Sequence, residues 1–231
     1  MPTFEATKTG YAHLWETMAI RPSYARTAGG IAGQISTLTR KGAYEAVSRK
    51  TGVPWWFIAI THQLESSGDF GTHLHNGDPL SARTRQEPKH RPVAGSPPFT
   101  WEESAEDALR MHNLHLVTDW TIPRALYEFE RFNGWGYLPR KVNSPYLWSF
   151  STHYDKGKYV ADGKFDRNAV SGQCGAAVLL RCLIDLEKIK PEAVPLPAAF
   201  AKPAKAEPRK GAGIFETLKT MVLAWRTTSS R

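Results

Sequence analysis

One acidic residue, Glu65, lies where a buried helix is expected to end. Residues 55–60 are apolar almost all the way round a helix, which predicts a buried helix that begins near Pro54. Residues 66–68, Ser-Ser-Gly, are stop signals, so Glu65 falls in the last turn. Unpaired carbonyl groups and neighbouring aromatic rings both oppose ionisation of a carboxyl group there. Glu65 is therefore predicted to stay protonated near neutral pH, as a general acid in glycosidic-bond cleavage must.

A second acidic group should stand near Glu65, because glycosidases of both stereochemical classes use two carboxyl groups. The groups lie about 5 Å apart when the second is a nucleophile and about 6.5–9.5 Å apart when it holds a water molecule. Asp78 is the preferred partner, since it occupies a polar Gly-Asp-Pro turn where solvent and backbone amides would keep it ionised. Asp69 is the rival, although a residue so near Glu65 could simply brace the turn. A third possibility is that no second carboxylate acts and the substrate itself assists.

The stretch from Glu65 to Leu80 reads ESSGDFGTHLHNGDPL. Its first part, Glu-Ser-Ser-x-x-Phe, resembles the catalytic Glu-Ser element of goose-type lysozymes and lytic transglycosylases. The whole stretch resembles a bacterial and phage group of lysozyme family proteins, and the similarity covers about residues 10–188. The resemblance implies a lysozyme-like fold and a peptidoglycan-degrading muramidase that hydrolyses β-1,4 glycan bonds with Glu65 as general acid. It also implies a mechanism without metal or cofactor.

Two other activities are compatible with the same resemblance. A lytic transglycosylase would cleave the same bond with substrate assistance and leave anhydro-muramyl ends. A saccharide-binding or morphogenetic protein would keep the fold without catalysis.

Polar and aromatic side chains in three stretches could contact a glycan. Residues 131–137 resemble the Tyr-Asn-x-Gly segment that lines the sugar groove in lytic transglycosylases, but Phe132 replaces the tyrosine and lacks its hydroxyl group. Sugar rings stack on aromatic faces, while amides and hydroxyl groups bind the sugar hydroxyls. The predicted substrate-binding residues are Ser66, His73, His75, Asn76, Asn133, Gly134, Tyr137 and Tyr146.

The histidines near Glu65 also raise the question of a metal. His73 and His75 would point the same way on a strand, and His62 and Asp78 are close in sequence. No further ligand stands at a recognisable zinc spacing. We therefore expect no metal, and we expect these histidines to bind sugar hydroxyls or to hold the loop.

The composition is typical of a globular protein that binds a polyanion. Of the 231 residues, 41% are hydrophobic, which is enough for a sizeable core. The net charge of +8 suits nucleic acid, an anionic membrane or a bacterial envelope. The sequence has no nucleic-acid motif and no compact basic block, so the expected partner is peptidoglycan and not nucleic acid.

The expected location and redox state follow from local features. The N-terminus has no apolar signal segment, and no stretch is long enough to span a membrane. The protein is therefore expected to be made in the cytoplasm and to act on the cell wall after release or export. Cys174 and Cys182 would be about 12 Å apart on a helix, which is too far for a disulfide.

Hydrophobic periodicity predicts a mainly α protein, α+β at most. Besides the helix that ends at Glu65, helices are expected at residues 11–20, 23–38, 41–50, 101–113, 120–132 and 166–188, with Thr100 and Asp119 as N-caps. Residues 69–99 are rich in Gly and Pro, which predicts a long loop with at most one short hairpin. We expect this loop to form one wall of a cleft beside Glu65.

Composition divides the chain into three parts. Residues 1–190 are predicted to form the lysozyme-like catalytic domain, and residues 191–212 a Pro/Ala-rich linker. Residues 213–231 carry apolar side chains at helical spacing beside basic ones, which predicts a basic amphipathic helix. Such a helix could bind an anionic membrane or envelope surface, fold back onto the catalytic domain or pair with a partner. We expect the protein to be a monomer.

Overall fold

The computed structural model describes residues 1–190 and 193–195. The predicted helix 213–231 lies outside these residues, and so does the predicted linker 191–212 apart from residues 193–195. The described chain is mainly helical, as the sequence predicts, and it carries one small two-stranded sheet. In chain order its elements are α1 (Phe4–Thr17), α2 (Pro22–Ile35), α3 (Leu38–Thr51), α4 (Trp55–Ser66), α5 (Trp101–Met111), η1 (Leu114–Leu116), α6 (Ile122–Asn133), η2 (Leu138–Arg140), α7 (Pro145–Trp148), β1 (Lys158–Ala161), β2 (Lys164–Asp166) and α8 (Ala176–Asp185).

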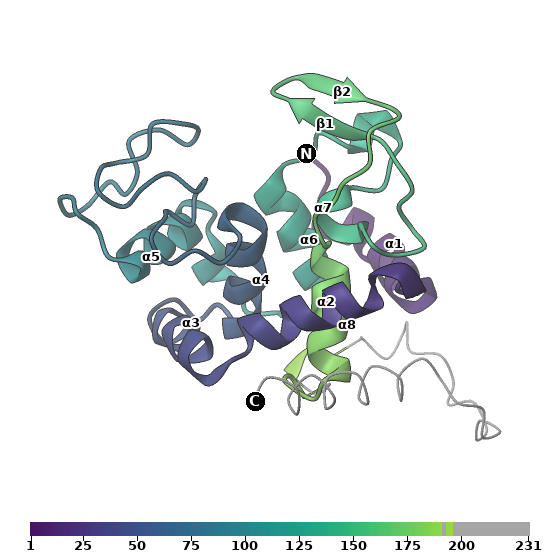
Figure 1. Cartoon of the computed structure of the whole chain (residues 1–231), viewed down its shortest axis with the longest axis horizontal. Coiled ribbons are helices and arrows are strands. Elements are labelled where there is room, and N and C mark those ends of the chain that lie inside the picture. The colour runs from purple at the N-terminus through teal and green to yellow at the C-terminus, as the bar shows by residue number, and fades with distance from the viewer. Residues whose placement is uncertain (191–192, 196–231) are drawn as a thin grey trace, which may run out of the picture.

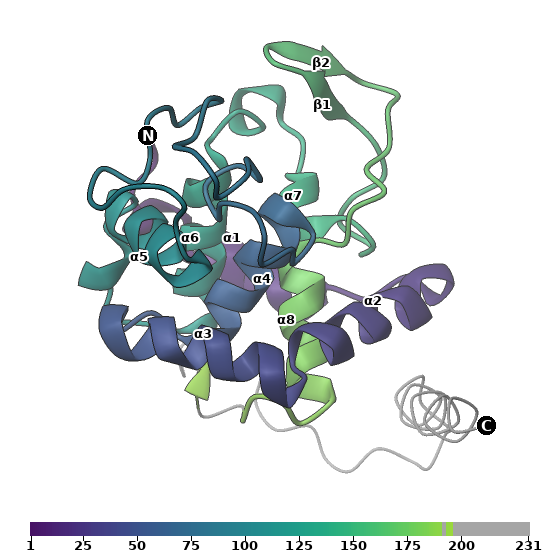
Figure 2. The ribbon, with the colours of Figure 1, turned by 60° about the vertical axis from the view of Figure 1, so that its left-hand side comes forward.

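Helix α4 is the centre of the core. Its residues 56–62 are all buried, as expected of a helix that is apolar on every side. It packs against α2, α3 and α8, and both views of the ribbon place it in the middle of the helical body (Figure 1, Figure 2). Phe57 stacks on Phe129 of α6 with ring centroids 4.1 Å apart. Because close-packed interiors resist deformation, this enclosure fixes the position of the last turn of α4.

The other helices form pairs around α4, and two of them begin at residues that the sequence did not indicate. Helix α1 packs on α6, and α2 packs on α8. Helix α1 begins at Phe4, earlier than predicted, because the Thr3 hydroxyl caps it by accepting the Ala6 amide. Helix α6 begins at Ile122 with Thr121 as N-cap. The prediction that Asp119 caps this helix is therefore wrong.

The predicted helix 166–188 is wrong in its first half. Strands β1 and β2 pair antiparallel, and α8 begins only at Ala176. Asp166 ends the second strand, and its Oδ1 accepts the amides of Asn168 over 2.8 Å and Ala169 over 3.3 Å. Such local bonds from an aspartate side chain compete with helix formation.

Residues 69–99 form a long loop, as predicted. In this fully described stretch the strand pairing is limited to one isolated bridge between Thr72 and Pro79, so the short hairpin considered for it is absent. The hairpin of this protein is β1–β2 instead. Both views show the loop and this hairpin at the same end of the molecule, on either side of the C-terminal end of α4 (Figure 1, Figure 2).

The structure bears on two further predictions, one on the cysteines and one on membrane-spanning segments. Cys174 and Cys182 are buried and unpaired, as predicted, although Cys174 precedes α8 instead of lying in it. Among the described helices, none has the length and apolar character that crossing a bilayer requires.

Candidate active site

Helix α4 ends abruptly after Ser66, and this ending places Glu65 in the last turn. Ser67 and Gly68 adopt left-handed backbone conformations, with φ of 54° and 72°. A side chain at Gly68 would be strained by this φ, and its Cβ atom would lie 3.0 Å from the Arg40 guanidinium. Arg40 Nη1 donates a hydrogen bond of 2.7 Å to the Gly68 carbonyl oxygen. The predicted position of Glu65 at a helix end is confirmed.

The Glu65 carboxyl group is partly buried and bonded to Tyr146. The Tyr146 hydroxyl donates to Glu65 Oε1 over 2.7 Å. Burial raises the pKa of Glu65 to about 7, and the bond from Tyr146 offsets only part of this rise. Burial, together with the Glu65 carboxyl group, raises the pKa of Tyr146 well above its usual value, so the phenol remains a donor. Glu65 therefore keeps its proton up to about neutral pH.

Helix α7, which carries Tyr146, is held in place by the backbone of Gly175. The Gly175 N–H donates to the Ser149 carbonyl oxygen at the end of α7 over 3.1 Å. Gly175 lies so close to α7 that a Cβ atom would stand 2.3 Å from the Leu147 carbonyl oxygen. A residue with any side chain would push α7 away, so this close approach depends on glycine.

The same segment also binds the end of α4. Gln173 Nε2 donates to the Leu64 carbonyl oxygen over 2.6 Å, next to Glu65 in the chain. Residues 173–175 therefore fasten α7 to the last turn of α4. Gln173 could not be predicted as a site residue from the sequence, because nothing local connects it to a helix end more than a hundred residues earlier.

A second buried acid, Glu130 of α6, is an electrostatic neighbour of Tyr146. The residue is 7% exposed, and burial raises its pKa to about 7, a rise that the neighbouring Ser144 hydroxyl offsets only in part. Glu130 is not among the site residues predicted from the sequence. The available signal was its helical spacing from the buried Leu126, which places it on the apolar face of α6.

Asp78 lies in the loop that packs on the end of α4. A Cβ atom on the preceding glycine would be 3.5 Å from the Glu65 carbonyl oxygen. Asp78 Oδ2 accepts the amides of Arg85 over 2.7 Å and Gln86 over 3.0 Å, and the Asn76 side-chain amide over 3.1 Å. Burial alone would raise the pKa of Asp78, but these donors outweigh it and keep the pKa below its usual value. Asp78 is thus ionised, and one of its oxygens holds the loop together.

Asp69, the rival carboxylate, braces the turn after α4. Its Oδ1 accepts the Gly71 amide over 2.8 Å, and its carbonyl oxygen accepts from the Thr72 hydroxyl over 3.0 Å. These bonds are the bracing contacts that the sequence suggested for a residue so near Glu65.

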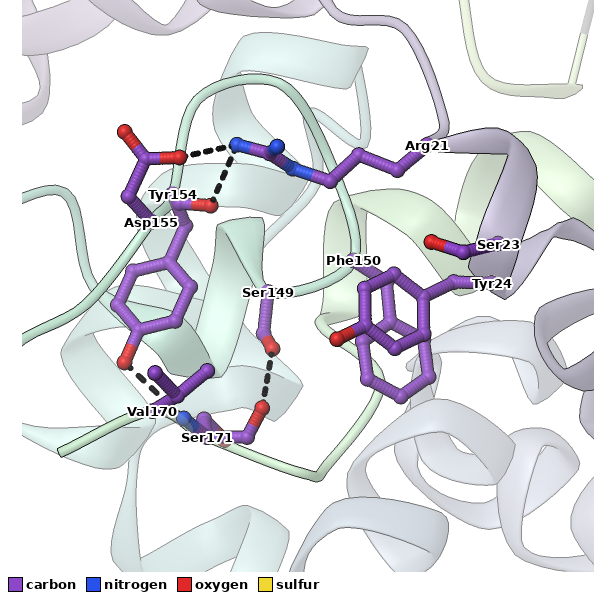
Figure 3. A pocket seen from close by; sticks show the side chains of 9 residues that line it. All are labelled: Arg21, Ser23, Tyr24, Ser149, Phe150, Tyr154, Asp155, Val170 and Ser171. Atoms are coloured by element: carbon purple, nitrogen blue, oxygen red, sulfur yellow. Dashed lines mark hydrogen bonds and ion pairs between the residues drawn. The ribbon is translucent and has the colours of Figure 1, made fainter.

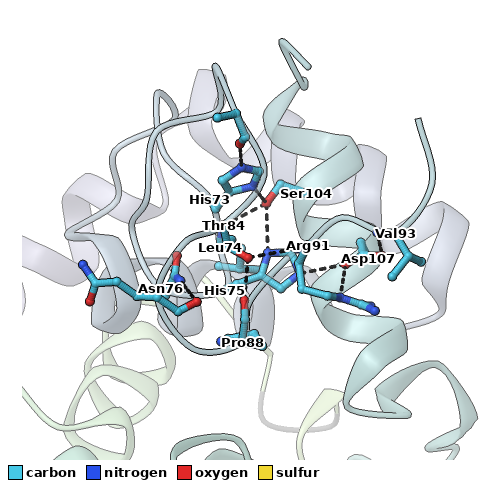
Figure 4. Close-up of polar contacts among 12 residues, drawn as sticks. His73, Leu74, His75, Asn76, Thr84, Pro88, Arg91, Val93, Ser104 and Asp107 are labelled. Atoms are coloured by element: carbon cyan, nitrogen blue, oxygen red, sulfur yellow. Dashed lines mark hydrogen bonds and ion pairs between the residues drawn. The ribbon is translucent and has the colours of Figure 1, made fainter. Parts of the chain in front are cut away.

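His73 and His75 are buried and fasten the loop to α5 (Figure 4). His73 Nε2 donates to the Ala82 carbonyl oxygen, and its Nδ1 is bonded to Ser104 Oγ, each over 2.8 Å. His75 Nε2 donates to Asp107 Oδ2 over 2.8 Å. Burial lowers the pKa of His75, although the bond to Asp107 favours the protonated form. Of the two roles expected for these histidines, the structure shows the one that holds the loop.

Ser104, His75 and Asp107 also form a Ser-His-Asp set, with Ser104 Oγ 3.3 Å from His75 Nδ1. A nucleophilic serine must be reachable by the substrate. Ser104 is 0% exposed, and its Oγ also accepts the Leu74 amide over 3.2 Å. We therefore assign this set to the structure of the loop and not to nucleophilic catalysis.

Two other predicted substrate contacts, Ser66 and Asn76, use their side chains within the protein. Ser66 Oγ donates to the His62 carbonyl oxygen over 3.2 Å, inside α4. Asn76 Nδ2 donates to the Gln86 carbonyl oxygen over 3.1 Å, in addition to its bond with Asp78. Both residues are only partly buried, so each remains accessible at the surface beside the end of α4.

His62 lies in an aromatic cluster beneath the end of α4. Trp101 Nε1 donates to His62 Nε2 over 3.0 Å, and His62 Nδ1 is 3.0 Å from the Tyr44 hydroxyl. Burial lowers the pKa of His62 to about 4, so the ring is neutral. Within the described ranges, no three or more His, Cys, Asp or Glu side chains are arranged to hold a metal ion.

The remaining predicted contacts, Asn133, Gly134 and Tyr137, lie between the end of α6 and η2. Gly134 ends α6 with a φ of 90°, Asn133 is exposed, and the Tyr137 hydroxyl accepts the Tyr159 amide of β1 over 3.3 Å. In the described part of the chain none of the three is bonded to Glu65. Tyr137 thus helps to join the hairpin to η2, together with Arg140, whose Nε donates to the Tyr159 hydroxyl over 3.4 Å.

A pocket of about 220 Å³ opens between the start of α2 and the residues that follow α7 (Figure 3). Tyr24 and Phe150 stack along its side with ring centroids 4.1 Å apart. Ser149 Oγ donates to the Ser171 carbonyl oxygen over 3.2 Å. Ser171 belongs to the same stretch as Gln173, so the pocket and the end of α4 share one neighbouring segment. No pattern in the sequence predicted this pocket.

Comparisons with protein-family models, with curated proteins and with solved structures found no match. The geometry around Glu65 and the motif that surrounds it are therefore the basis for assigning a function.

The chemistry available at this site is proton donation. Glu65 provides a carboxylic acid, and Tyr146 can stabilise the carboxylate that forms after the proton leaves. Asp69 and Asp78 are two further carboxylates in the loop that follows the end of α4.

Proposed function

We propose that this protein is a peptidoglycan-degrading glycosidase with a lysozyme-like fold, and that Glu65 is its general acid. The observation that carries the proposal is the carboxyl group of Glu65 at the end of a buried helix, bonded to Tyr146 and with its pKa raised to about 7 by burial. Cleavage of a glycosidic bond requires an acid with a raised pKa to protonate the leaving oxygen. The substrate class comes from residues 65–80, which resemble lysozyme family proteins.

In this proposal Tyr146 positions the acid and does not bind the sugar directly. Its hydroxyl donates to Glu65 Oε1, and such a bond is stronger when the acceptor is ionised. Tyr146 therefore stabilises the carboxylate after Glu65 has given its proton to the leaving oxygen. Because the Tyr146 hydroxyl occupies Oε1 of Glu65, Oε2 is the oxygen that carries the proton and donates it to the leaving oxygen.

Removing the Tyr146 hydroxyl should shift the pH dependence of peptidoglycan cleavage toward higher pH. The hydroxyl lowers the pKa of Glu65, so Tyr146→Phe is expected to raise this pKa further and to shift the alkaline limb of activity upward by about one pH unit. The rate of peptidoglycan cleavage as a function of pH measures the limb. Tyr154→Phe is the control, because Tyr154 is also buried and its hydroxyl binds the Gly157 carbonyl oxygen instead. An unchanged or lower limb in Tyr146→Phe would contradict the role of Tyr146.

Whether a second carboxylate, Asp78, takes part in catalysis distinguishes a hydrolase from a transglycosylase. The bonds that Asp78 accepts all reach Oδ2, and its Oδ1 has no hydrogen-bond partner among the described residues. In a hydrolase, Oδ1 would orient the attacking water. A lytic transglycosylase is the second candidate, because the charge of Asp78 is already used by three donors from the loop and needs no catalytic role.

Asp78→Asn tests the role of this carboxylate. The asparagine can still accept the amides of Arg85 and Gln86 through its oxygen, so the loop should keep its shape. If Asp78 activates water, the rate of cleavage is expected to fall by at least about tenfold. A rate within a factor of about two of wild type would remove Asp78 from the mechanism and favour substrate assistance.

The products of cleavage test the proposed function itself. Purified peptidoglycan is incubated with the full chain, and the new ends are identified by mass spectrometry after reduction with borohydride. New reducing ends identify a hydrolase, and anhydro-muramyl ends identify a transglycosylase. If neither appears while the protein sediments with the wall, the protein binds saccharide without catalysis and the proposal is wrong.

A further inference from the structure

The β hairpin forms an arm, residues 155–169, in which charged side chains of both signs are frequent. The arm carries four basic residues: Lys156, Lys158, Lys164 and Arg167. It also carries three acidic residues: Asp155, Asp162 and Asp166. The formal net charge of the arm is small. Whether each charged side chain is already paired within the protein therefore decides how the arm can bind a charged ligand.

Two of the three acidic groups are engaged in local bonds. Asp155 pairs with Arg21 outside the arm, and Asp166 Oδ1 accepts two backbone amides. Among the basic groups, Lys158, Lys164 and Arg167 have no ion pair with any described residue. The ion pair with Arg21 offsets the charge of Asp155, whereas neutral amide donors leave the charge of Asp166 in place. The arm therefore keeps four basic side chains against the unpaired charges of Asp162 and Asp166, which is more positive than its formal balance.

The aromatic rings of the arm face its base. The Tyr159 ring lies 5.3 Å from the ring of Tyr137 and 5.3 Å from that of Phe165, between ring centroids. The Arg140 guanidinium covers the Phe165 ring at 5.2 Å from its centroid. Insertion into a bilayer uses exposed apolar or aromatic side chains. Val160 is the single large hydrophobic side chain exposed on the described arm, so the arm is better suited to a charged polymer than to lipid.

The arm is fixed to the elements that hold the proposed acid. A Cβ atom at Gly157 would lie 3.0 Å from the Phe165 ring and 3.6 Å from Val142, three residues before α7. Helix α7 in turn carries Tyr146, which is bonded to Glu65. Both ribbon views show the arm beyond α7, at the end of the molecule where α4 terminates (Figure 1, Figure 2). A polymer bound to the arm would therefore lie close to a glycan strand bound at Glu65.

We infer that the arm is a docking surface for an anionic phosphodiester polymer attached to the wall glycan. Lysine side chains act as mobile point charges for phosphate, and free charges on both strands can follow a chain of phosphates. The inference rests on the proposed function for the wall as target, but it concerns binding and not cleavage.

The test compares two variants with the same loss of charge. The arm variant carries Lys158→Gln, Lys164→Gln and Arg167→Gln. The control variant carries Arg26→Gln, Arg49→Gln and Lys188→Gln; these residues are exposed on α2, on α3 and after α8, and have no ion pair with described residues. Both use the full chain with Glu65→Gln, so that the wall is not degraded, and residues 196–231 are the same in both.

Binding is measured by sedimentation with purified walls that carry teichoic acid, and with the same walls after hydrofluoric acid has removed the phosphodiester polymer. We expect the arm variant to bind the untreated walls at least about tenfold more weakly than the parent at low salt, and the control variant to change by less than about threefold. Neither variant should differ from the parent on the stripped walls.

Three results would overturn the inference. Equal losses in both variants would assign the effect to net charge and not to the arm. The same loss by the arm variant on stripped walls would assign the contact to the glycan or to peptide carboxylates. A loss confined to vesicles of equimolar phosphatidylglycerol and phosphatidylcholine, with wall binding intact, would make the arm a membrane contact. Because binding is measured without turnover, a failure of the proposed cleavage does not affect this result.

Discussion

Glu65→Gln is expected to lower the rate of peptidoglycan cleavage by about 10²–10⁴-fold while the protein remains folded. Glutamine has the shape of glutamate and can still accept the Tyr146 hydroxyl, but it has no carboxylic proton to donate. The rate should be measured about one unit below the Glu65 pKa of about 7, where the wild-type acid is protonated. Circular dichroism and thermal unfolding show whether the fold is intact. Lysis at the wild-type rate by this variant would refute the assignment.

Glu130→Gln is the matched control, because Glu130 is a second buried carboxyl group whose pKa is also raised to about 7. The same chemical change there should reduce the rate of cleavage by less than about tenfold, since Glu130 is not proposed to donate a proton to the substrate.

The pH dependence of thermal stability gives a further check on Glu65. Its pKa rises on folding from 4.5 to about 7, so the folded wild type should lose stability as the pH increases between these values. Glu65→Gln should lack that part of the pH dependence.

Gly175→Ala is expected to destabilise the fold by about 3 kcal/mol or more. The new Cβ atom would stand 2.3 Å from the Leu147 carbonyl oxygen and 2.8 Å from the Trp148 nitrogen. Both are backbone atoms, so no rotation of a side chain can relieve the clash. The φ of −73° at Gly175 is allowed for alanine, so the clash and not backbone strain would cause the loss of stability. Helix α7 would have to move away, and cleavage should fall because Tyr146 moves with it.

Gly172→Ala is the control for this substitution. A Cβ atom at Gly172 would have no atom within 4 Å, so the free energy of unfolding should change by no more than about 0.5 kcal/mol. Urea or thermal unfolding of both variants measures the difference. Equal stability of the two would mean that α7 does not approach residue 175 as closely as the structure indicates.

The sequence determined the features that depend on neighbouring residues. The apolar run before Glu65 specifies a helix that must be buried, and the Ser-Ser-Gly after it ends that helix, so Glu65 has its place without reference to the rest of the chain. The start of α5 is of the same kind, because Thr100 and Glu103 form a capping box within one turn. The mainly helical class followed from the same local periodicities.

Where local patterns were ambiguous, tertiary contacts decided the outcome. The apolar residues around α8 predicted a helix from residue 166, but the pairing of β1 with β2 and the close approach of Gly175 to α7 delay it to Ala176. For His73 and His75 the sequence leaves open whether they bind sugar or hold the loop, and they hold the loop because α5 offers Ser104 and Asp107 as buried partners.

The partner of the proposed acid was also decided by the tertiary structure. The sequence predicts Tyr146 as a sugar-binding residue, whereas the structure shows it bonded to Glu65, 81 residues away in the chain. No pattern of spacing along the chain predicts such a contact, because it depends on how α7, α8 and α4 pack. The sequence therefore placed the acid at the end of a helix, whereas the packing of distant helices gave it the burial that sets its pKa and the hydroxyl group that holds it.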